Sequence, residues 1–342
     1  MSGTMKFTRR SFLIMTTAAL AACKPGQEIL KFSGDTMGTR YNVVAVSSGQ
    51  KLDRDALQGA IDAALAEVDT QMSNWNAGSE ISRINAAATG EAQRLSPALA
   101  HVMAGAQSVH QASDGRFDVT VGPLIDLWGF GADGAMPHIP ADADIADAMT
   151  RAGQSDVLAI SGDTLTKTAP GAGIYLAAIG KGYGVDRVAD TLRAHGLKDF
   201  MVEIGGDLYT AGLNPEGMSW QIGIETPVAG QRGLYDVVNV SGLGMATSGD
   251  YRNFFEDAGQ RYSHIIDPAR GRPILHDTVS ATVLTEDAML ADAWATAMLV
   301  LGRERGLEIA EANDLAVVFI DRAGDAFVTA QSSRYAALQA TA

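Results

Sequence analysis

Short strand-like segments joined by tight-turn signals constrain the fold of this chain more than any other feature. The paired segments are 156–160 with 164–168, 200–204 with 208–211, 254–255 with 262–266, and 315–320 with 326–329. The first pair flanks Ser161-Gly162-Asp163 and the second flanks Gly205-Gly206, both of which are turn sequences. Connections this short join antiparallel neighbours, because a parallel pair needs a crossover of about a dozen residues or more. We therefore expect largely antiparallel sheets.

Helical patterns alternate with these strands. Leu57, Ile61, Leu65, Val68 and Met72 recur at three- and four-residue steps, which predicts an amphipathic helix. Helices are expected at 53–72, 96–113, 141–152, 179–195, 288–301 and 303–313. Further strands are expected at 32–46 (a pair broken near 35–39), 115–121, 174–176, 220–225, 237–240 and 278–285, with a loop at 128–140. The fold class is α+β, with mixed, largely antiparallel sheets and packed helices. No glycine fingerprint of a dinucleotide-binding βαβ unit is present.

The N-terminus has the pattern of an export signal. Arg9 and Arg10 precede an apolar run over 12–22, which ends in small residues before Cys23. This order is typical of a secretory signal. The run is about half of the roughly 20 residues that a membrane-spanning helix needs. We expect residues 1–22 to be a signal for twin-arginine export.

Cys23 is the only cysteine of the chain. A buried structural thiol is the common state of a free cysteine, but no folded core precedes Cys23. Lipidation at a new N-terminus explains its position, and export as a soluble protein with cleavage nearby is the alternative. We expect a lipidated Cys23, a linker over 23–30, and a periplasmic, membrane-anchored lipoprotein without an intramolecular disulfide.

The net charge of the chain limits the classes of partner that it is expected to bind. The formal net charge is −14 at pH 7, and loss of the signal would remove only basic residues, namely Lys6, Arg9 and Arg10. A surface this acidic argues against nucleic acid and against electrostatic binding to anionic lipid.

Two segments place glycines where a ligand would approach the backbone. Gly34 and Gly38 lie on either side of Met37, although an ordinary turn between strands is the simpler explanation. Lys181 lies between two glycines at a predicted helix start, where backbone N–H groups and an ammonium form an anion site. The alternative is a helix start with a solvated lysine.

Two other segments carry side chains suited to catalysis or metal binding. His264 and Ile266 share one face of a predicted strand, and His264 is either catalytic or structural. Asp292 and Thr296 are four residues apart, so both lie on one side of an apolar helix. Burying a carboxylate and a hydroxyl in a core costs free energy unless a partner binds them. Mg²⁺ is a candidate partner, because it prefers oxygen ligands. In the alternative, Asp292 faces solvent and Thr296 bonds back to its own helix.

These segments, in this order, resemble the ApbE family of FAD:protein FMN transferases. The resemblance runs from Met37 to about Thr296, and further matching stretches are 72–75, 79–85, 117–124, 203–207 and 246–251. It implies an ApbE-like (T-fold-like) flavin transferase domain over 31–335. Some family members with twin-arginine signals, the NosX type, serve nitrous-oxide respiration.

The resemblance also assigns site residues by position. The residues that match FAD-site positions are Met37, Trp75, Arg116, Phe117, Asp118, Lys181 and Ile266. The metal site is matched by the side chains of Asp292 and Thr296 and by the backbones of Ala178 and Ala295. Tyr175 stands where the family usually has an aspartate that contacts FAD. A tyrosine can hydrogen-bond or stack on a ring, but it brings no charge.

The activity that the resemblance implies is Mg²⁺-dependent, with FAD as the substrate. A Ser or Thr hydroxyl of an acceptor protein attacks the phosphorus on the FMN side of FAD, and AMP leaves. His264 is the candidate base, ahead of Asp250 and Asp267. The expected acceptor is a membrane or periplasmic respiratory subunit with a motif resembling Asp-x-x-Ser/Thr-Gly-Ala-Thr. Hydrolysis of FAD to FMN and AMP, and a non-catalytic flavin-binding lipoprotein, are the alternatives.

Overall fold

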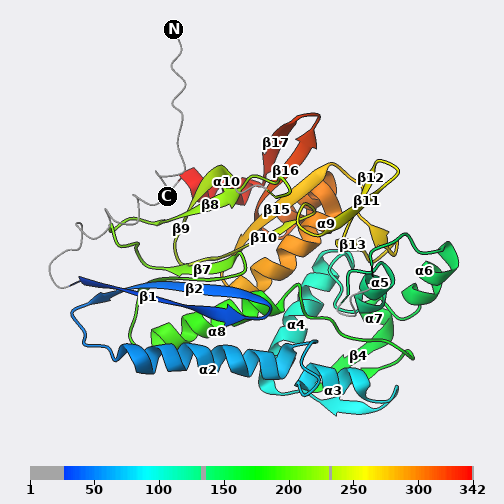
Figure 1. Cartoon of the computed structure of the whole chain (residues 1–342), viewed down its shortest axis with the longest axis horizontal. Helices are drawn as coiled ribbons and strands as arrows, with labels where there is room; N and C mark the ends of the chain where they lie inside the picture. The colour runs from blue at the N-terminus through cyan, green and yellow to red at the C-terminus, as the bar shows by residue number, and fades with distance from the viewer. Residues whose placement is uncertain (1–26, 132–135, 231–232, 341–342) are drawn as a thin grey trace, which may run out of the picture.

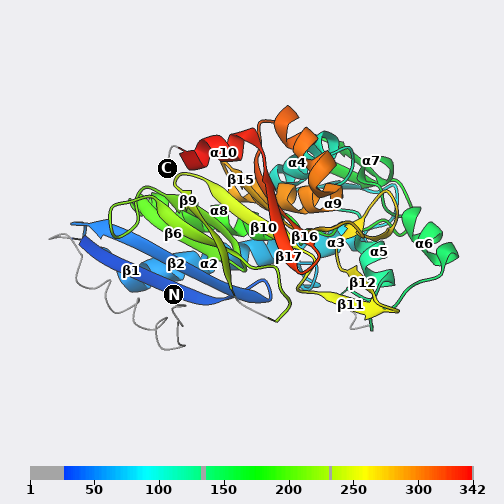
Figure 2. The same ribbon diagram turned by 90° about the horizontal axis from the view of Figure 1, so that it is seen from above.

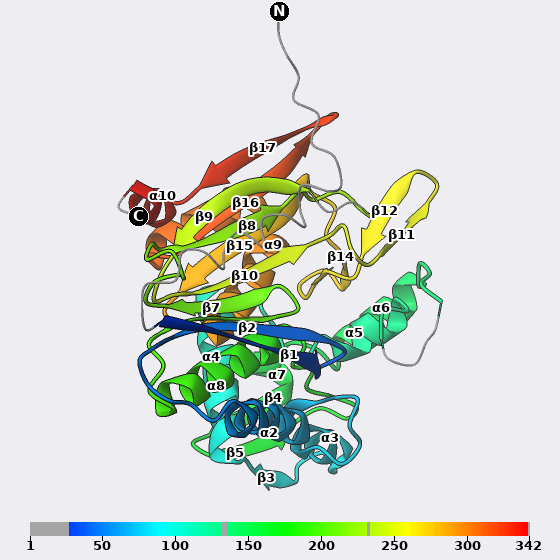
Figure 3. The same cartoon turned by 60° about the vertical axis from the view of Figure 1, so that its left-hand side comes forward.

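An antiparallel sheet forms the centre of the molecule. The structure, a computed structural model, describes residues 27–131, 136–230 and 233–340. Within these ranges eight strands follow one another in the order β1-β2-β6-β7-β10-β15-β16-β17, and each neighbouring pair is antiparallel (Figure 3). Their bounds are β1 Gln27–Thr36, β2 Thr39–Ser48, β6 Asp199–Ile204, β7 Asp207–Ala211, β10 Gly244–Gly249, β15 Thr278–Thr285, β16 Ala316–Ala323 and β17 Ala326–Gln331. The predicted α+β class is confirmed.

Two layers of helices cover one face of the sheet (Figure 1). The helices are α2 (Arg54–Met72), α4 (Pro97–Ala112), α8 (Gly180–Ala194) and α9 (Ala288–Ala312). α8 and α9 pack side by side against the sheet, whereas α2 packs on α8 and α4 on α9. The apolar stripe of α2 is buried, including Leu57, Ile61 and Leu65, and it joins Val185 and Val188 of α8 in one core cluster.

The opposite face is covered by a hairpin and the last helix (Figure 2). The hairpin consists of β8 (Trp220–Glu225) and β9 (Leu234–Val240), and the helix is α10 (Ser333–Ala340). Ile224, Val238 and Tyr335 from these elements pack with Val318 and Leu284 of the sheet.

Smaller elements surround the layers. They are α3 (Glu80–Ala86), β3 (Ala92–Arg94), α5 (Gly122–Leu127), α6 (Asp142–Met149), α7 (Gln154–Val157), β4 (Leu158–Ser161), β5 (Thr164–Lys167), β11 (Phe254–Asp257), β12 (Gln260–Ser263), β13 (Ile266–Asp267) and β14 (Arg272–Pro273). The predicted hairpins β4–β5, β6–β7, β11–β12 and β16–β17 all form. Helices α3, α5, α7 and α10 were not expected from the sequence, and α7 includes the first two residues of the strand predicted at 156–160.

Side-chain hydrogen bonds cap the N-terminal ends of α2 and α4, close to where the sequence predicted these helices to begin. Asp53 accepts hydrogen bonds from two backbone N–H groups of α2, and Ser96 accepts one from α4. In α9, Gly302 has a non-helical backbone (φ 72°, ψ 173°), which separates the two helices predicted there.

Two predicted strands are wrong, because side chains take the place of a strand partner. In 115–121, the carboxylate of Asp118 accepts hydrogen bonds from Thr120 N–H, Thr120 Oγ1–H and Gln154 N–H, which holds an irregular loop. In 174–176, the backbone of Ile174 is clamped by Asn85 through two hydrogen bonds of 2.8 Å. Both segments are therefore loops beside the sheet rather than parts of it.

The start of the described chain corrects one boundary. β1 begins at Gln27 and pairs with β2, and Leu30 is buried, so residues 27–30 belong to the sheet and not to a linker. The predicted signal and Cys23 lie outside the described residues. Among those that are described, no helix combines the length and the apolar character needed to cross a membrane.

Candidate active site

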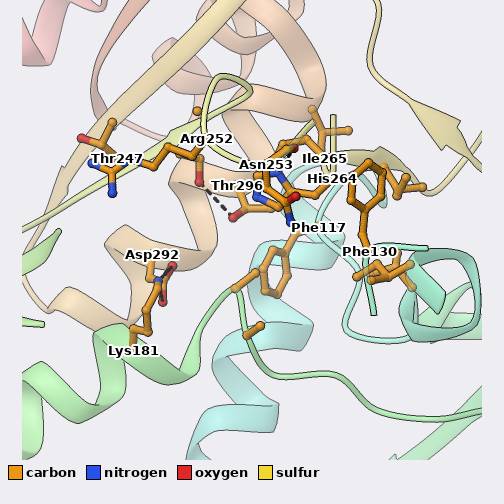
Figure 4. Close-up of a pocket in the computed structure, with 18 of the residues that line it drawn as sticks. Phe117, Phe130, Lys181, Thr247, Arg252, Asn253, His264, Ile265, Asp292 and Thr296 are labelled. Carbon is orange, nitrogen blue, oxygen red and sulfur yellow. Dashed lines mark hydrogen bonds and ion pairs between the residues drawn. The ribbon is translucent and has the colours of Figure 1, made fainter. Parts of the chain in front are cut away.

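A cavity of about 630 Å³ lies where the loops after α4 and before α8 meet the sheet and α9. Eleven of the residues singled out in the sequence line it: Trp75, Arg116, Phe117, Asp118, Tyr175, Ala178, Lys181, His264, Ile266, Asp292 and Thr296. In Figure 4, Lys181 and Asp292 lie close together, while His264 and Phe130 lie on the other side of the view. The structure therefore brings residues from distant parts of the chain into one space.

A lysine and two carboxylates form the most buried polar cluster of the cavity. Lys181 comes from the first turn of α8, Asp292 from α9, and Asp207 from the start of β7 after Gly205-Gly206. The Lys181 ammonium pairs with Asp207 Oδ2 and lies 3.2 Å from each carboxylate oxygen of Asp292. The N–H of Gly182 donates to Asp292 Oδ2 at 3.1 Å. The solvated lysine and the solvent-facing Asp292 that the sequence left open are both wrong.

The electrostatics of this cluster follow from burial and from its two acids. Burial alone would lower the pKa of Lys181, but the carboxylates of Asp207 and Asp292 raise it above its ordinary value. Burial, followed by repulsion from Asp292, raises the pKa of the Asp207 carboxyl. One ammonium faces two carboxylates, so the cluster favours a further cation.

The oxygen donors around the cluster fit a magnesium ion. Among the described residues no three His, Cys, Asp or Glu side chains cluster as a metal site would require. Mg²⁺ commonly uses one or two carboxylates and completes its shell with water and substrate phosphates. Asp292 and Asp207 supply the carboxylates, and Thr296 Oγ1, 3.1 Å from Ser248 Oγ, supplies a hydroxyl on the same side of α9. Thr296 therefore bonds to Ser248 rather than back to its own helix, which was the alternative.

Two aromatic rings stand at the entrance. Trp75 is 62% exposed, and its ring meets that of Tyr175 edge-on at 5.6 Å between centroids. Burial, followed by the charge of Asp126, raises the pKa of Tyr175 to about 12, so the phenol is neutral at physiological pH. An exposed Trp against a fixed Tyr offers a flat apolar surface to a ring system.

His264 has one ring nitrogen fixed and the other available. Its Nδ1 lies 3.1 Å from the carbonyl oxygen of Asn253, which can only accept, so Nδ1 carries the proton and Nε2 has the free lone pair. Burial lowers the pKa of His264. This tautomer and this neutral charge state are those of a general base.

The other two candidate bases have different partners. Asp267 Oδ1 forms an ion pair with Arg116 at 3.2 Å and also accepts from Ala269 N–H. Asp250 is buried, and its nearest cation is Arg322 at 3.9 Å. Asp250 does not line the cavity, nor does Asp267.

Two residues predicted for the site are not among those lining it. Met37 occupies the turn between β1 and β2 with φ 48°, and its side chain packs against Gly184 of α8. The turn that the sequence allowed is present, and the contact of Met37 with FAD stays a prediction. Ala295 is buried in α9. Asp118 does line the cavity, but its oxygens are engaged with the loop described above.

Sequence reasoning gave no role to three polar residues of the site. Asp207 follows two glycines inside a recognised stretch, and a carboxylate after a tight Gly-Gly turn was the available signal. Ser248 lies in β10, and Arg252 comes shortly after the end of that strand. Arg252 pairs with Glu225 of β8 at 2.5 Å. No local sequence pattern marks Ser248 or Arg252, because only the order of the strands in the sheet brings them to the cavity.

Comparison with known proteins gives relatives over nearly the whole chain. The model of the ApbE family matches residues 37–319. The FAD:protein FMN transferase of Vibrio cholerae is 42% identical over 316 residues, covering 92% of this chain and 94% of the relative. The protein of that name from Haemophilus influenzae is 38% identical over 329 residues, covering 94% and 95%.

Solved structures agree with this result. The flavin transferase ApbE from Vibrio cholerae superposes with a TM-score of 0.85 at 41% identity, covering 91% of this chain and 99% of that one. The apo flavinyl transferase ApbE of Pseudomonas stutzeri gives 0.84 at 38% identity, covering 92% and 97%. With the family model, the sequence relatives and the fold in agreement, this chain belongs to the ApbE family.

Proposed function

We propose that this chain is an FAD:protein FMN transferase, which moves FMN from FAD to a Ser or Thr hydroxyl of an acceptor protein and releases AMP. The observation that carries the proposal is one cavity lined by an aromatic entrance, a lysine between two acids, and a histidine with a free nitrogen. The same activity is named for relatives that match this chain over nearly their full length.

The residues of the cavity have different chemical roles in this reaction. Trp75 and Tyr175 offer their rings to the flat parts of FAD. Lys181 and Arg116, which both line the cavity, provide positive charge for the pyrophosphate. His264 Nε2 takes the proton of the acceptor hydroxyl, whose oxygen forms a bond to the FMN-side phosphorus. The bridging P–O bond breaks, and its electron pair leaves with AMP.

Asp292, Asp207 and Thr296 are the residues that would hold Mg²⁺. A bound Mg²⁺ supplies charge neutralisation and orientation of the pyrophosphate oxygens. The protein contributes a buried, oxygen-rich position for it, and the reaction is then accelerated mainly by positioning and electrostatics.

Export and anchoring form a second part of the proposal. Arg9-Arg10, the apolar run and Cys23 support twin-arginine export and a lipid anchor on the periplasmic side of a membrane. An acceptor on a respiratory membrane or periplasmic subunit fits that location. Metabolic labelling with a radioactive fatty acid tests the anchor, since a Cys23→Ser variant should take up no label.

One incubation tests the activity. The chain, FAD and Mg²⁺ are mixed with an acceptor domain that carries the Ser/Thr motif, and the products are analysed by mass spectrometry. Transfer adds one FMN to the acceptor. Free FMN with AMP would indicate hydrolysis instead, and unchanged FAD would indicate binding without catalysis.

A further inference from the structure

Lys181 lies between two carboxylates of the cavity. Its ammonium contacts Asp207 Oδ2 and both oxygens of Asp292, so three carboxylate oxygens surround one cationic atom. The side chains of Asp207 and Asp292 are each 4% exposed, whereas that of Lys181 is 30% exposed. The acids are fixed in the core, and the lysine approaches them from the cavity.

The backbone holds the acids in place without the lysine. Asp292 lies in the helical part of α9 and accepts the N–H of Gly182, and Asp207 is fixed in the β6–β7 hairpin opposite Ile204. Lys181, by contrast, reaches the acids through a four-carbon stem that can adopt other rotamers. The lysine is therefore the member of the cluster that can move.

We propose that Lys181 is a built-in placeholder for the divalent cation, and that Asp207 joins Asp292 in contacting that cation. In the free chain the ammonium neutralises part of the acidic pair. When FAD binds, its pyrophosphate offers the ammonium another partner, and the two carboxylates become available to Mg²⁺. This inference rests on the proposed function, because it concerns how the same site takes its metal.

Coupling between the two ligands follows from this exchange. Without FAD, Mg²⁺ must displace an ammonium that is already paired, so its affinity is reduced. With FAD present, the ammonium is drawn away and the affinity for Mg²⁺ rises. By linkage, Mg²⁺ must raise the affinity for FAD by the same factor.

Titration of the purified chain with Mg²⁺ alone, followed by calorimetry, tests the placeholder role. The variant Lys181→Met should bind Mg²⁺ about tenfold more tightly than the parent, since the competing ammonium is gone, although it should bind FAD more weakly. Tenfold corresponds to about 1.4 kcal/mol. FAD should also improve the Mg²⁺ affinity of this variant by a smaller factor than it does for the parent, since only the direct contact of the phosphates with the ion remains. Lys198→Met, at an exposed lysine outside the cavity, is the matched control and should behave as the parent.

The variant Asp207→Asn tests the second part, because it keeps the shape of the side chain and removes its charge. It should bind Mg²⁺ at least about tenfold more weakly in the presence of FAD. Unchanged affinity would show that Asp207 serves only to hold the lysine. Equal or weaker Mg²⁺ binding by Lys181→Met would overturn the placeholder role.

Protein stability gives an independent measurement if two uncompensated acids weaken the fold of Lys181→Met. Mg²⁺ should then raise the melting temperature of this variant more than that of the parent, and an equal or smaller increase would contradict the exchange. None of these titrations contains an acceptor. A failure of FMN transfer would therefore leave their outcome unaffected, and the two proposals can fail separately.

Discussion

The close packing of α8 against α9 should depend on the missing side chain of Gly182. A Cβ at this position would lie 2.1 Å from the carbonyl oxygen of Ala288 and 2.8 Å from Cα of Met289. Both are backbone atoms, so no rotamer change can relieve the contact, and the helices would have to separate. Overpacking costs about 1–3 kcal/mol and occasionally more, against a gain of about 1 kcal/mol for Ala over Gly within a helix. A clash with backbone atoms lies at the upper end of the overpacking range, about 3 kcal/mol, so after the gain of about 1 kcal/mol we expect Gly182→Ala to lower the free energy of unfolding by about 2 kcal/mol or more.

Gly180 provides the matched control two residues earlier in the same helix. No atom lies within 4 Å of a Cβ built there, so Gly180→Ala should be neutral or stabilise by up to about 1 kcal/mol. Urea unfolding of both variants, followed by tryptophan fluorescence, gives the comparison. Equal stability of the two variants would refute the claim that the close approach of α8 and α9 requires Gly182.

Four other changes should have distinct effects. Asp292→Ala should abolish Mg²⁺-dependent FMN transfer, and normal transfer by this variant would disprove the metal assignment. His264→Gln should slow transfer by about 10²–10⁴-fold. Because the pKa of His264 is lowered, the parent should lose activity only as the pH falls below the ordinary histidine value, and a kcat/KM profile of the variant should lack that acidic limb. Trp75→Ala should weaken FAD binding by about 1–3 kcal/mol, as measured by flavin fluorescence. Its unfolding free energy should change by no more than about 0.5 kcal/mol, since the side chain is 62% exposed. Asn85→Ala removes two of the three side-chain hydrogen bonds to the backbone of Ile174 and leaves the one from Asn74 to its carbonyl. It should cost about 1–3 kcal/mol in a urea titration, whereas an unchanged midpoint would mean that the loop does not depend on Asn85.

Local signals in the sequence predicted the parts of the fold that depend on near neighbours. The stripe of α2, the starts of α2 and α4 near Asp53 and Ser96, and the break at Gly302 each involve residues within a few positions of one another. The same holds for Asp292 and Thr296, whose spacing places both on the side of α9 that meets the cavity. Periodicity and capping are properties of single elements, so they can be recognised without the tertiary structure.

Features that depend on distant residues could not be predicted in the same way. The segment around Ile174 has a strand-like composition, but Asn85, far away in the chain, satisfies its backbone instead of a neighbouring strand. Asp207 acquires its role only because the hairpin after β6 lies beside α8 and α9. Such assignments need the order of the strands, which local patterns do not contain.

The pairing of β2 with β6 has a kinetic consequence. Asn42 lies opposite Glu203, so the loop that this pair of strands closes contains α2, α4 and α8. Contacts between positions so far apart in sequence make folding slow, because the entropy of a long loop is lost before the pairing compensates for it. The cavity then still needs α9, which follows β15 near the end of the chain. During synthesis, the ability to capture flavin therefore arises late, and chains that lack α9 do not yet have the complete cavity.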